Sequence, residues 1–347
     1  MRVQGFSGSE TCGVNRASNN KQNLANKIGA RDALCVLSSI VPRTSSIKTM
    51  FQGTDNYNEI LTTYAQGAHA NPDGAVDVCR LIFPAVAVDE AVGTYDKWTL
   101  DPSFTPVDTG LARNQSAHRI NIDRRQETFN CTPHALEIAH WTPALMQKSG
   151  PRYREAGVRT LMSSQFISRQ STAVDILKKE VAEDTTLAIT AAADPIVQID
   201  KLCEKVAGGV VGRMPKTIIM GRNAWNFIKN HEEVKKRCHG LNYAIKPEQL
   251  KDALAYNGIN LVISDLYVMK NGVMVPLLGY DVVALYNEEA PGLSDLSFGK
   301  EFTLSPAGPE VLSWKDNALY DVDTLVWSSD RKVTNSAAAA RLTVNVA

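Results

Sequence analysis

The chain of 347 residues lacks any long apolar run. No stretch approaches the roughly 20 apolar residues that a membrane-spanning helix needs. The first 26 residues are polar and contain no hydrophobic segment of the kind that directs secretion. We therefore expect neither a membrane partner nor secretion.

Net charge is also absent, because 37 Lys and Arg residues balance 37 Asp and Glu residues. Proteins whose main task is to grip nucleic-acid phosphates usually carry a clear positive excess. The cysteines are widely scattered, and no two have Cys-x-x-Cys or metal-ligand spacing: Cys12, Cys35, Cys79, Cys131, Cys203 and Cys238. This pattern predicts free thiols in a reducing compartment.

Signatures of nucleotide binding and hydrolysis are missing. There is no Gly-x-x-x-x-Gly-Lys loop and no Gly-x-Ser-x-Gly elbow, and Gly209-Val-Val-Gly212 falls short of a dinucleotide fingerprint. No second His follows His231 at zinc-protease spacing, so we interpret His231 as a partly buried core residue of a helix from Trp225 to Cys238.

Other polar residues give no stronger signal for a catalytic or metal site. His134 and His140 share the parity of one strand, but no carboxylate or thiol is placed to complete a site. The pairs Glu288-Glu289 and Asp321/Asp323 are typical of solvated charge runs. The sequence predicts no catalytic residue, no cofactor and no metal, and hence no enzyme.

The main positive feature is a long two-limbed hairpin between Phe83 and Trp141. Its outgoing limb, Ala85 to Leu100, is rich in Val, Tyr, Trp and Thr, and its returning limb, His118 to Cys131, alternates with a phase slip near Arg124 and Arg125. An isolated ribbon is marginally stable in water, so we expect it to lie on a neighbouring copy of the chain. The side chains expected to make intersubunit contacts are Tyr95, Lys97, Trp98, Arg113, Arg119, Arg124 and Arg125.

Helical and strand periodicities organise the rest of the chain. Helices are predicted over 58–68, 151–184, 194–208 and 247–256, and buried strands over 217–220, 259–263 and 280–286. Asn271-Gly272 predicts a tight hairpin turn. From Leu296 to Val346 the period becomes two, which indicates antiparallel strands with one wet face, covered by the helix at 151–184. Residues 1–50 combine basic excess with the short apolar segment 33–37, which favours an arm that contacts a neighbour.

The order of these parts resembles the major capsid proteins of tailed bacteriophages. The resemblance rests on Asp77-Val-Cys-Arg-Leu-Ile-Phe-Pro-Ala-Val-Ala-Val88, Thr94-Tyr-Asp-Lys-Trp98, the long helix, Thr217-Ile-Ile-Met-Gly-Arg-Asn-Ala-Trp225 and Asn230-His-Glu-Glu-Val234. It covers roughly residues 60 to 330, and no single motif is specific by itself.

The resemblance implies an α+β, Hong Kong 97-like capsid fold. Its parts would be an N-terminal arm (1–60), a segment leading into the P-domain (61–83), an extended E-loop (84–133), a P-domain with a spine helix (134–193), an A-domain (194–290), and a P-domain return with C-terminal strands (291–347).

The resemblance also implies a function. Hexamers and pentamers of the chain would close into an icosahedral head in the virion, assembled in the host bacterial cytoplasm. The implied partners are other copies of the chain, a portal protein, scaffold or decoration proteins, and double-stranded DNA in loose contact.

Two departures from the family bear on this reading. Some relatives begin with a long cleaved scaffolding segment, whereas this chain starts at Met1 with a short arm. Some cross-link through an E-loop lysine, and here the outgoing limb offers only Lys97. The sequence shows neither the acceptor nor the carboxylate that would activate it, so this chemistry is not carried over to the chain. The alternatives are an encapsulin-like nanocompartment shell around protein cargo, and an α/β enzyme that holds a nucleotide within residues 194–290.

Overall fold

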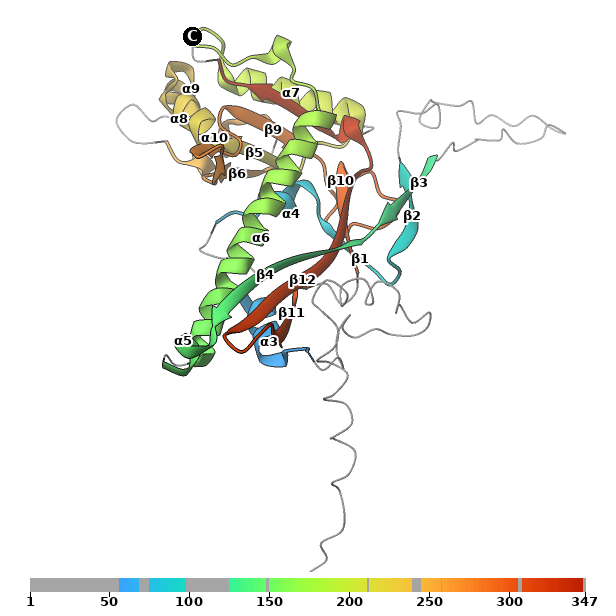
Figure 1. Ribbon diagram of the computed structural model, residues 1–347. Helices are drawn as coiled ribbons and strands as arrows, with labels where there is room; N and C mark the ends of the chain where they lie inside the picture. Colours follow the sequence, from blue (N-terminus) through green and yellow to red (C-terminus); the bar gives the residue numbers. More distant parts are fainter. Residues whose placement is uncertain are drawn as a thin grey trace, which may run out of the picture. The chain divides into compact units, whose positions relative to one another are not determined.

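The computed structural model describes residues 56–68, 75–97, 125–147, 150–210, 212–238, 245–256, 258–304 and 308–345 (Figure 1). These residues form a mixed helix and sheet fold with a five-stranded sheet, a four-stranded sheet and two separate two-stranded ribbons. The helical elements are α3 (Glu59–Ala68), α4 (Val78–Ile82), α5 (Thr142–Gln147), α6 (Gly150–Glu180), η3 (Thr185–Leu187), α7 (Pro195–Gly209), α8 (Arg222–Asn230), α9 (Glu232–Arg237), α10 (Pro247–Ala253) and η4 (Ser336–Ala338).

The larger sheet is built around the 14-residue strand β12 (Tyr320–Val333). One edge of β12 pairs antiparallel with β11 (Glu310–Lys315) and then with β10 (Gly299–Leu304), and its other edge pairs with β4 (Thr132–Trp141). The short strand β1 (Ala85–Val88) adds to β10 in parallel. The antiparallel pairing predicted after residue 296 is confirmed for these strands.

The outgoing limb predicted over 85–100 is two strands, not one. β1 belongs to the larger sheet, and the chain then turns at residues 89–91 into β2 (Val92–Lys97), which pairs antiparallel with β3 (Arg125–Asn130). The β2–β3 hairpin lies on the opposite side of β10 from α6 (Figure 1). Both faces of β10 are therefore covered, and the expectation of a wet face is wrong there: Gly299, Lys300, Glu301 and Phe302 are all buried.

Helix α6 confirms the predicted spine, because it starts one residue before Pro151 and ends four residues before Asp184. Its 31 residues span about 46 Å at 1.5 Å per residue. The first half packs on β4 and β12, and the second half reaches the smaller sheet (Figure 1). Its buried stripe contains two polar residues, Gln165 and Gln170. Gln170 accepts from the Cys79 amide at 2.7 Å and donates to Asp77 at 2.6 Å, so it fixes the start of α4.

A glycine in α6 permits a close approach to the larger sheet. Gly157 is buried, and a Cβ at this position would clash with the ring of His140 on β4. The sequence marks Gly157 only as a weak point of the helix. The structure gives the residue a packing role, because the missing side chain makes room for the imidazole.

The smaller sheet has the order β13 (Ala339–Thr343), β9 (Asp281–Leu285), β5 (Thr217–Gly221) and β6 (Asn260–Ser264). β5 and β6 are parallel, and the other pairs are antiparallel. Helix α7 packs on β13 and β9, and α8 packs on β5 and β6. The C-terminal strand β13 therefore belongs to this sheet, and not to the sheet that contains β10.

A separate ribbon, β7 (Tyr267–Lys270) and β8 (Val273–Pro276), follows β6. Asn271 and Gly272 connect the two strands with φ values of 52° and 79°. Two consecutive positive φ values are the signature of the tight hairpin turn that Asn-Gly predicts, so this prediction is confirmed.

Candidate functional site

An aromatic cluster anchors the β2–β3 hairpin to its own chain. Phe302 of β10 is fully buried and stacks on Phe129 of β3, with ring centroids 4.3 Å apart. Tyr95 of β2 lies 5.5 Å from Phe302 and is 2% exposed. Gly93 stands opposite Phe129, and a Cβ at Gly93 would clash with the phenyl ring. The glycine therefore leaves room for the Phe129 ring to lie over β2. The base of the hairpin thus lies on its own sheet, which corrects the expectation that it lies only on a neighbouring copy.

A polar row continues along the same face of the hairpin, because Glu127 stands opposite Tyr95 and Arg125 stands opposite Lys97. Glu127 accepts a hydrogen bond from the Tyr95 hydroxyl at 2.8 Å and pairs with Lys97 at 2.9 Å. The bond from Lys97 is the main reason that the pKa of Glu127 is lowered, whereas burial and then Glu127 raise the pKa of Tyr95. A further bond joins the Asn130 amide to Asp330 of β12 at 2.8 Å. These contacts hold the hairpin in a defined position on the sheet.

The predicted contact residues divide into three groups. Tyr95 has its ring and its hydroxyl engaged within its own chain. Lys97 and Arg125 stand opposite each other at the open end of the hairpin, where Arg125 is exposed and Lys97 is half-buried. The remaining residues lie outside the described ranges: Trp98, Arg113, Arg119 and Arg124.

Next to Phe302, a buried ion cluster joins β10 to α6 and β12. Glu301 is 1% exposed and binds Arg169 of α6 at 2.6 Å and Arg331 of β12 at 2.7 Å. Burial alone would raise the pKa of Glu301, but the two guanidinium groups outweigh it, and the pKa is lowered. The carboxylate therefore stays ionised and fixes α6 against the strand that carries the hairpin anchor.

A second buried carboxylate fixes the other end of α6. Asp323 of β12 is fully buried and binds Arg154 of α6 at 2.8 Å, His140 of β4 at 3.2 Å and Ser313 of β11 at 2.6 Å. Burial opposes ionisation, but these partners leave the pKa of Asp323 lowered. The interpretation of Asp323 as part of a solvated run is wrong, and the buried ring of His140 has a structural partner.

A third carboxylate ties the C-terminal half of α6 to the smaller sheet. Asp281 of β9 binds Lys178 of α6 at 2.7 Å and Arg341 of β13 at 3.1 Å. Sequence reasoning missed all three carboxylate sites. The signal that could have indicated them is the set of charged residues inside strands that otherwise read as apolar, because a buried charge needs a partner.

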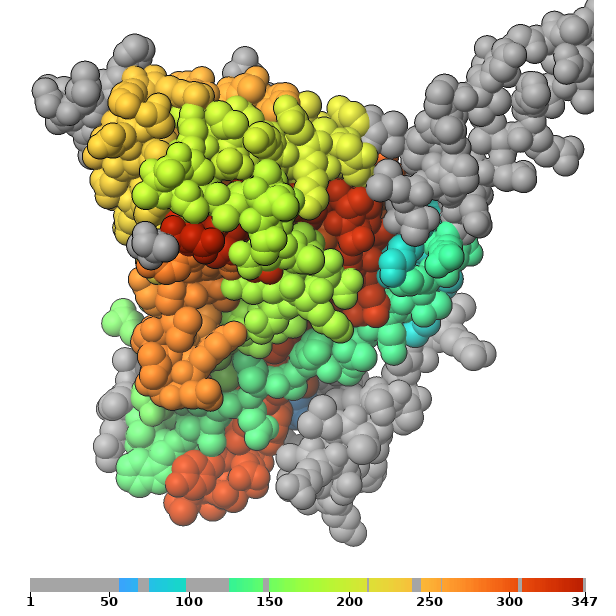
Figure 2. Space-filling model, turned by 90° about the horizontal axis from the view of Figure 1, so that it is seen from above, coloured from blue at the N-terminus to red at the C-terminus, as the bar shows by residue number. Residues whose placement is uncertain are grey.

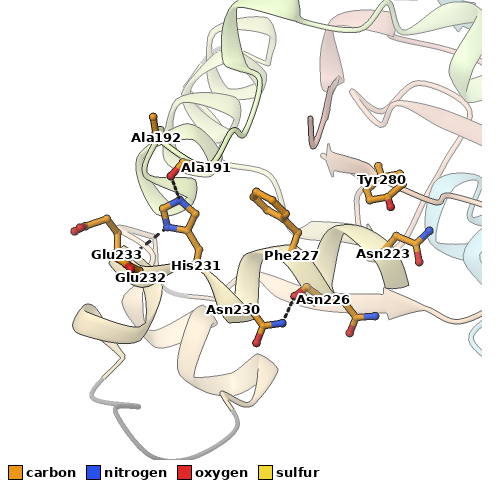
Figure 3. Close-up of a pocket in the computed structure, with 10 residues that line it drawn as sticks. All are labelled: Ala191, Ala192, Asn223, Asn226, Phe227, Asn230, His231, Glu232, Glu233 and Tyr280. Atoms are coloured by element: carbon orange, nitrogen blue, oxygen red, sulfur yellow. Dashed lines mark hydrogen bonds between the residues drawn. The ribbon is translucent and has the colours of Figure 1, made fainter. Parts of the chain in front are cut away.

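A groove of about 680 Å³ lies beside α8 (Figure 3). The amides of Asn223 and Asn226 and the ring of Phe227 line one side of it, and Tyr280 faces them from the other. At the end of the groove, His231 Nδ1 accepts from the Glu233 amide and Nε2 donates to the Ala191 carbonyl. The helix predicted from Trp225 to Cys238 is therefore two helices, and His231 caps the second one. The expected partial burial of His231 is confirmed, but the residue is a helix cap and not part of the hydrophobic core.

The groove has little of what a nucleotide site requires. None of the described residues that line it is Lys or Arg. At the start of α8, where an α/β enzyme often binds phosphate, the Ala224 amide donates instead to the Gly279 carbonyl at 3.2 Å. A Cβ on Gly221 would clash with the same carbonyl, so the main chain fills this position.

No three His, Cys, Asp or Glu side chains among the described residues gather as a metal ion would need. No helix in the described ranges combines the length and the apolar character that crossing a membrane requires.

Neither a protein-family model nor a curated protein matches the sequence. Solved structures do match. A phage-related protein from Bordetella bronchiseptica RB50 is 18% identical with a TM-score of 0.65, over 83% of this chain and 96% of that chain. A structure from Mycobacterium phage Che8 is 13% identical with a TM-score of 0.50, over 77% of this chain and 91% of that chain. The mature capsid of bacteriophage PhiM1 is 10% identical with a TM-score of 0.50, over 78% of this chain and 88% of that chain. The resemblance to phage capsid proteins is thus confirmed at the level of the fold.

Proposed function

We propose that the chain is the major capsid protein of a tailed bacteriophage, with the Hong Kong 97-like fold, and that its hexamers and pentamers form an icosahedral head around double-stranded DNA. The observation that supports the proposal is the fold shared with the phage-related protein over 83% of this chain and with the mature capsid of bacteriophage PhiM1 over 78%. A structural role also agrees with a groove that has no basic lining residue among those described. The chain would then reside in the virion after assembly in the host bacterial cytoplasm, with a portal protein and scaffold or decoration proteins as further partners.

The domain division follows from this proposal. The larger sheet with α6 corresponds to the P-domain, and the smaller sheet with α7 and α8 corresponds to the A-domain. One boundary changes, because β13 pairs with β9. Residues 339–343 are therefore assigned to the A-domain sheet, and the P-domain return ends with β12.

The hairpin is proposed to be the E-loop, and its distal part to be the intersubunit element. Lys97 and Arg125 are cross-strand partners, so residues 98–124 connect them beyond the anchored base. This segment carries Trp98 and the basic residues Arg113, Arg119 and Arg124. Single exposed ion pairs contribute only about 0 to 1 kcal/mol, so the effect would come from repetition over many subunits.

Electron microscopy of the purified chain tests the proposal. Closed shells are expected, and lumen contents separate the alternatives: DNA in particles from infected cells supports a phage head, whereas protein cargo indicates a nanocompartment. A chain that remains monomeric under all assembly conditions contradicts both readings. Catalytic activity of such a monomer with a nucleotide substrate would establish the enzyme alternative.

A deletion tests the role of the distal hairpin. Replacing residues 98–124 with Asn-Gly joins the paired residues Lys97 and Arg125 by a tight turn and leaves the aromatic anchor intact. The expected product is a folded subunit with an unchanged melting temperature that forms no shells. Normal shells from this variant would show that the segment is dispensable for assembly.

A further inference from the structure

The groove beside α8 presents polar groups that the chain itself does not use (Figure 3). The side chains of Asn223, Asn226 and Tyr280 line it, and in the described part of the chain none of the three has a hydrogen-bond partner. Tyr280 is 42% exposed, and the exposed carboxylate of Glu232 lies at the far end of the groove. Donors and acceptors for a ligand are therefore available around one space.

Helix α8 places amides and an aromatic ring on one face. Asn223, Asn226, Phe227 and Asn230 occupy positions i, i+3, i+4 and i+7, which are neighbours on the surface of a helix. The opposite face of α8 is buried on β5 and β6. Figure 2 shows the yellow segment with α8 and α9 at the surface, beside the yellow-green segment of α7. The amide row is thus held by a packed helix before any ligand arrives, as a binding site requires.

The lining chemistry favours an uncharged ligand rich in hydroxyl groups. A carboxamide both donates and accepts hydrogen bonds, and a hydroxyl group does the same, so the two match without any net charge. Phe227 and Tyr280 add flat apolar faces on which the C–H face of a sugar ring can pack. An anion is disfavoured, because Glu232 and Glu233 lie at one end and none of the described lining residues is Lys or Arg.

A peptide suits the groove less well than a sugar chain. Extended peptides bind by pairing with the free edge of a strand, and helical peptides bind by laying apolar side chains into a hydrophobic groove. The described lining residues come from α8, from the start of α9 and from turns at Ala191 and Tyr280, and none of them belongs to a strand. The space of about 680 Å³ is within the usual range of ligand sites, and it is an open groove that a chain of sugar units can follow.

We propose that the groove beside α8 binds an uncharged oligosaccharide. The amides of Asn223 and Asn226 bind its hydroxyl groups, Phe227 packs against one sugar ring, and Glu232 accepts a hydrogen bond from a hydroxyl at the end of the groove. All of these residues belong to one subunit. The inference therefore goes beyond the proposed function and does not depend on shell formation.

A glycan microarray probed with the free subunit tests the ligand class. The array carries neutral oligosaccharides together with sialylated and sulfated ones. We expect binding to neutral oligosaccharides, and isothermal titration calorimetry then gives the affinity for the one that binds best. Absence of binding to every neutral oligosaccharide, or binding to the acidic ones alone, overturns the inference.

A double variant tests whether the sugar lies in the groove. N223A/N226A removes two amides from helical positions that alanine favours, so the variant should melt no lower than the wild type. Its affinity should fall about tenfold or more, because two hydrogen bonds are lost. The matched control N260A removes an exposed asparagine side chain from β6, outside the groove, and should bind like the wild type.

Unchanged affinity of N223A/N226A overturns the inference. Failure of this variant to form shells under conditions where the wild type and N260A assemble also overturns it, because a copy of the chain would then occupy the groove. If the wild type itself forms no shell, the proposed function is refuted, and the sugar affinity of the free subunit still decides the inference.

Discussion

Replacing Glu301 with Gln should strongly destabilise the subunit, although the change alters only one atom. Glu301 is 1% exposed, and its two oxygens bind Arg169 at 2.6 Å and Arg331 at 2.7 Å. The two arginine side chains are each 12% exposed. The amide keeps the shape of the side chain but removes the carboxylate charge that both largely buried guanidinium groups bind.

The magnitude follows from the cost of an uncompensated buried charge. Removing one partner of a buried ion pair costs about 3 to 5 kcal/mol. The free energy of unfolding of a domain is about 5 to 15 kcal/mol, so this loss is a large fraction of the total stability. At an unfolding entropy of about 2.1 cal/mol/K per residue, this loss lowers the melting temperature of a 347-residue chain by about 4 to 7 °C.

The dependence of subunit stability on pH provides a second, independent test of the ionised Glu301. Burial opposes ionisation, but Arg169 and Arg331 leave the pKa of Glu301 below its ordinary value. A carboxyl whose folded pKa is lowered contributes stability above its unfolded pKa of about 4.3, and this contribution disappears as the pH falls through the folded pKa. The wild type should therefore lose stability below about pH 4.3, and the E301Q variant should lose less over the same range.

The assay is thermal and urea unfolding of the free subunit, followed by circular dichroism at neutral pH and at acidic pH. The matched control is E289Q, because the Glu289 side chain is 91% exposed and lies 3.7 Å from Lys216. This control should melt like the wild type. If E301Q also melts like the wild type at neutral pH, the reasoning about the buried cluster is wrong.

Three further perturbations test other parts of the structure. Phe302→Ala removes the ring under Phe129 and should cost about 3 to 5 kcal/mol, with faster proteolysis of the β2–β3 hairpin; an unchanged cleavage rate would contradict the anchor. Phe166→Asp places an unpaired carboxylate where the side chain is 8% exposed and should give insoluble or unfolded protein, so a soluble variant that assembles would show that this face of α6 tolerates solvent. Removing residues 1–50 should weaken shell assembly and leave the DNA affinity of the free subunit low and unchanged, as measured by light scattering and filter binding; lost DNA binding with intact assembly would make the arm a nucleic-acid contact.

The sequence predicts correctly the helices and turns that depend on residues close together in the chain. The periodicity of Val158, Met162 and Phe166 predicts α6, and Asn271-Gly272 predicts its hairpin turn. The break between β1 and β2 was missed because the residues on both sides favour strands. Asp89-Glu90 offered a signal there, because two acidic residues in succession are unusual inside a buried strand.

The candidate site was less predictable because its contacts are distant in sequence. Arg154 and Asp323 are 169 positions apart, and Arg169 and Glu301 are 132 apart. Nothing near Asp323 in the sequence indicates that β4, β11 and α6 converge on it. Tyr95 was assigned to a neighbouring subunit for the same reason, since its own partner Phe302 lies in a strand far along the chain.

The three buried carboxylates explain how a helix with an interrupted apolar stripe can act as a spine. Apolar packing decides which face of α6 turns toward the sheets. It does not fix the position of α6 along its own axis, because the apolar residues of one helical turn resemble those of the next. Arg154, Arg169 and Lys178 each bind one carboxylate at 2.6 to 2.8 Å, and the three acceptors lie on β12, β10 and β9. A slide of one turn moves every donor by about 5.4 Å and removes the α6 partner of each carboxylate. Glu301, Asp323 and Asp281 would then keep only their partners on the strands, and the displaced cations would lose their counter-charges. The ion pairs therefore set the axial position of α6 on both sheets at once, and they tie the strand under the hairpin anchor to the sheet from which the β7–β8 ribbon extends.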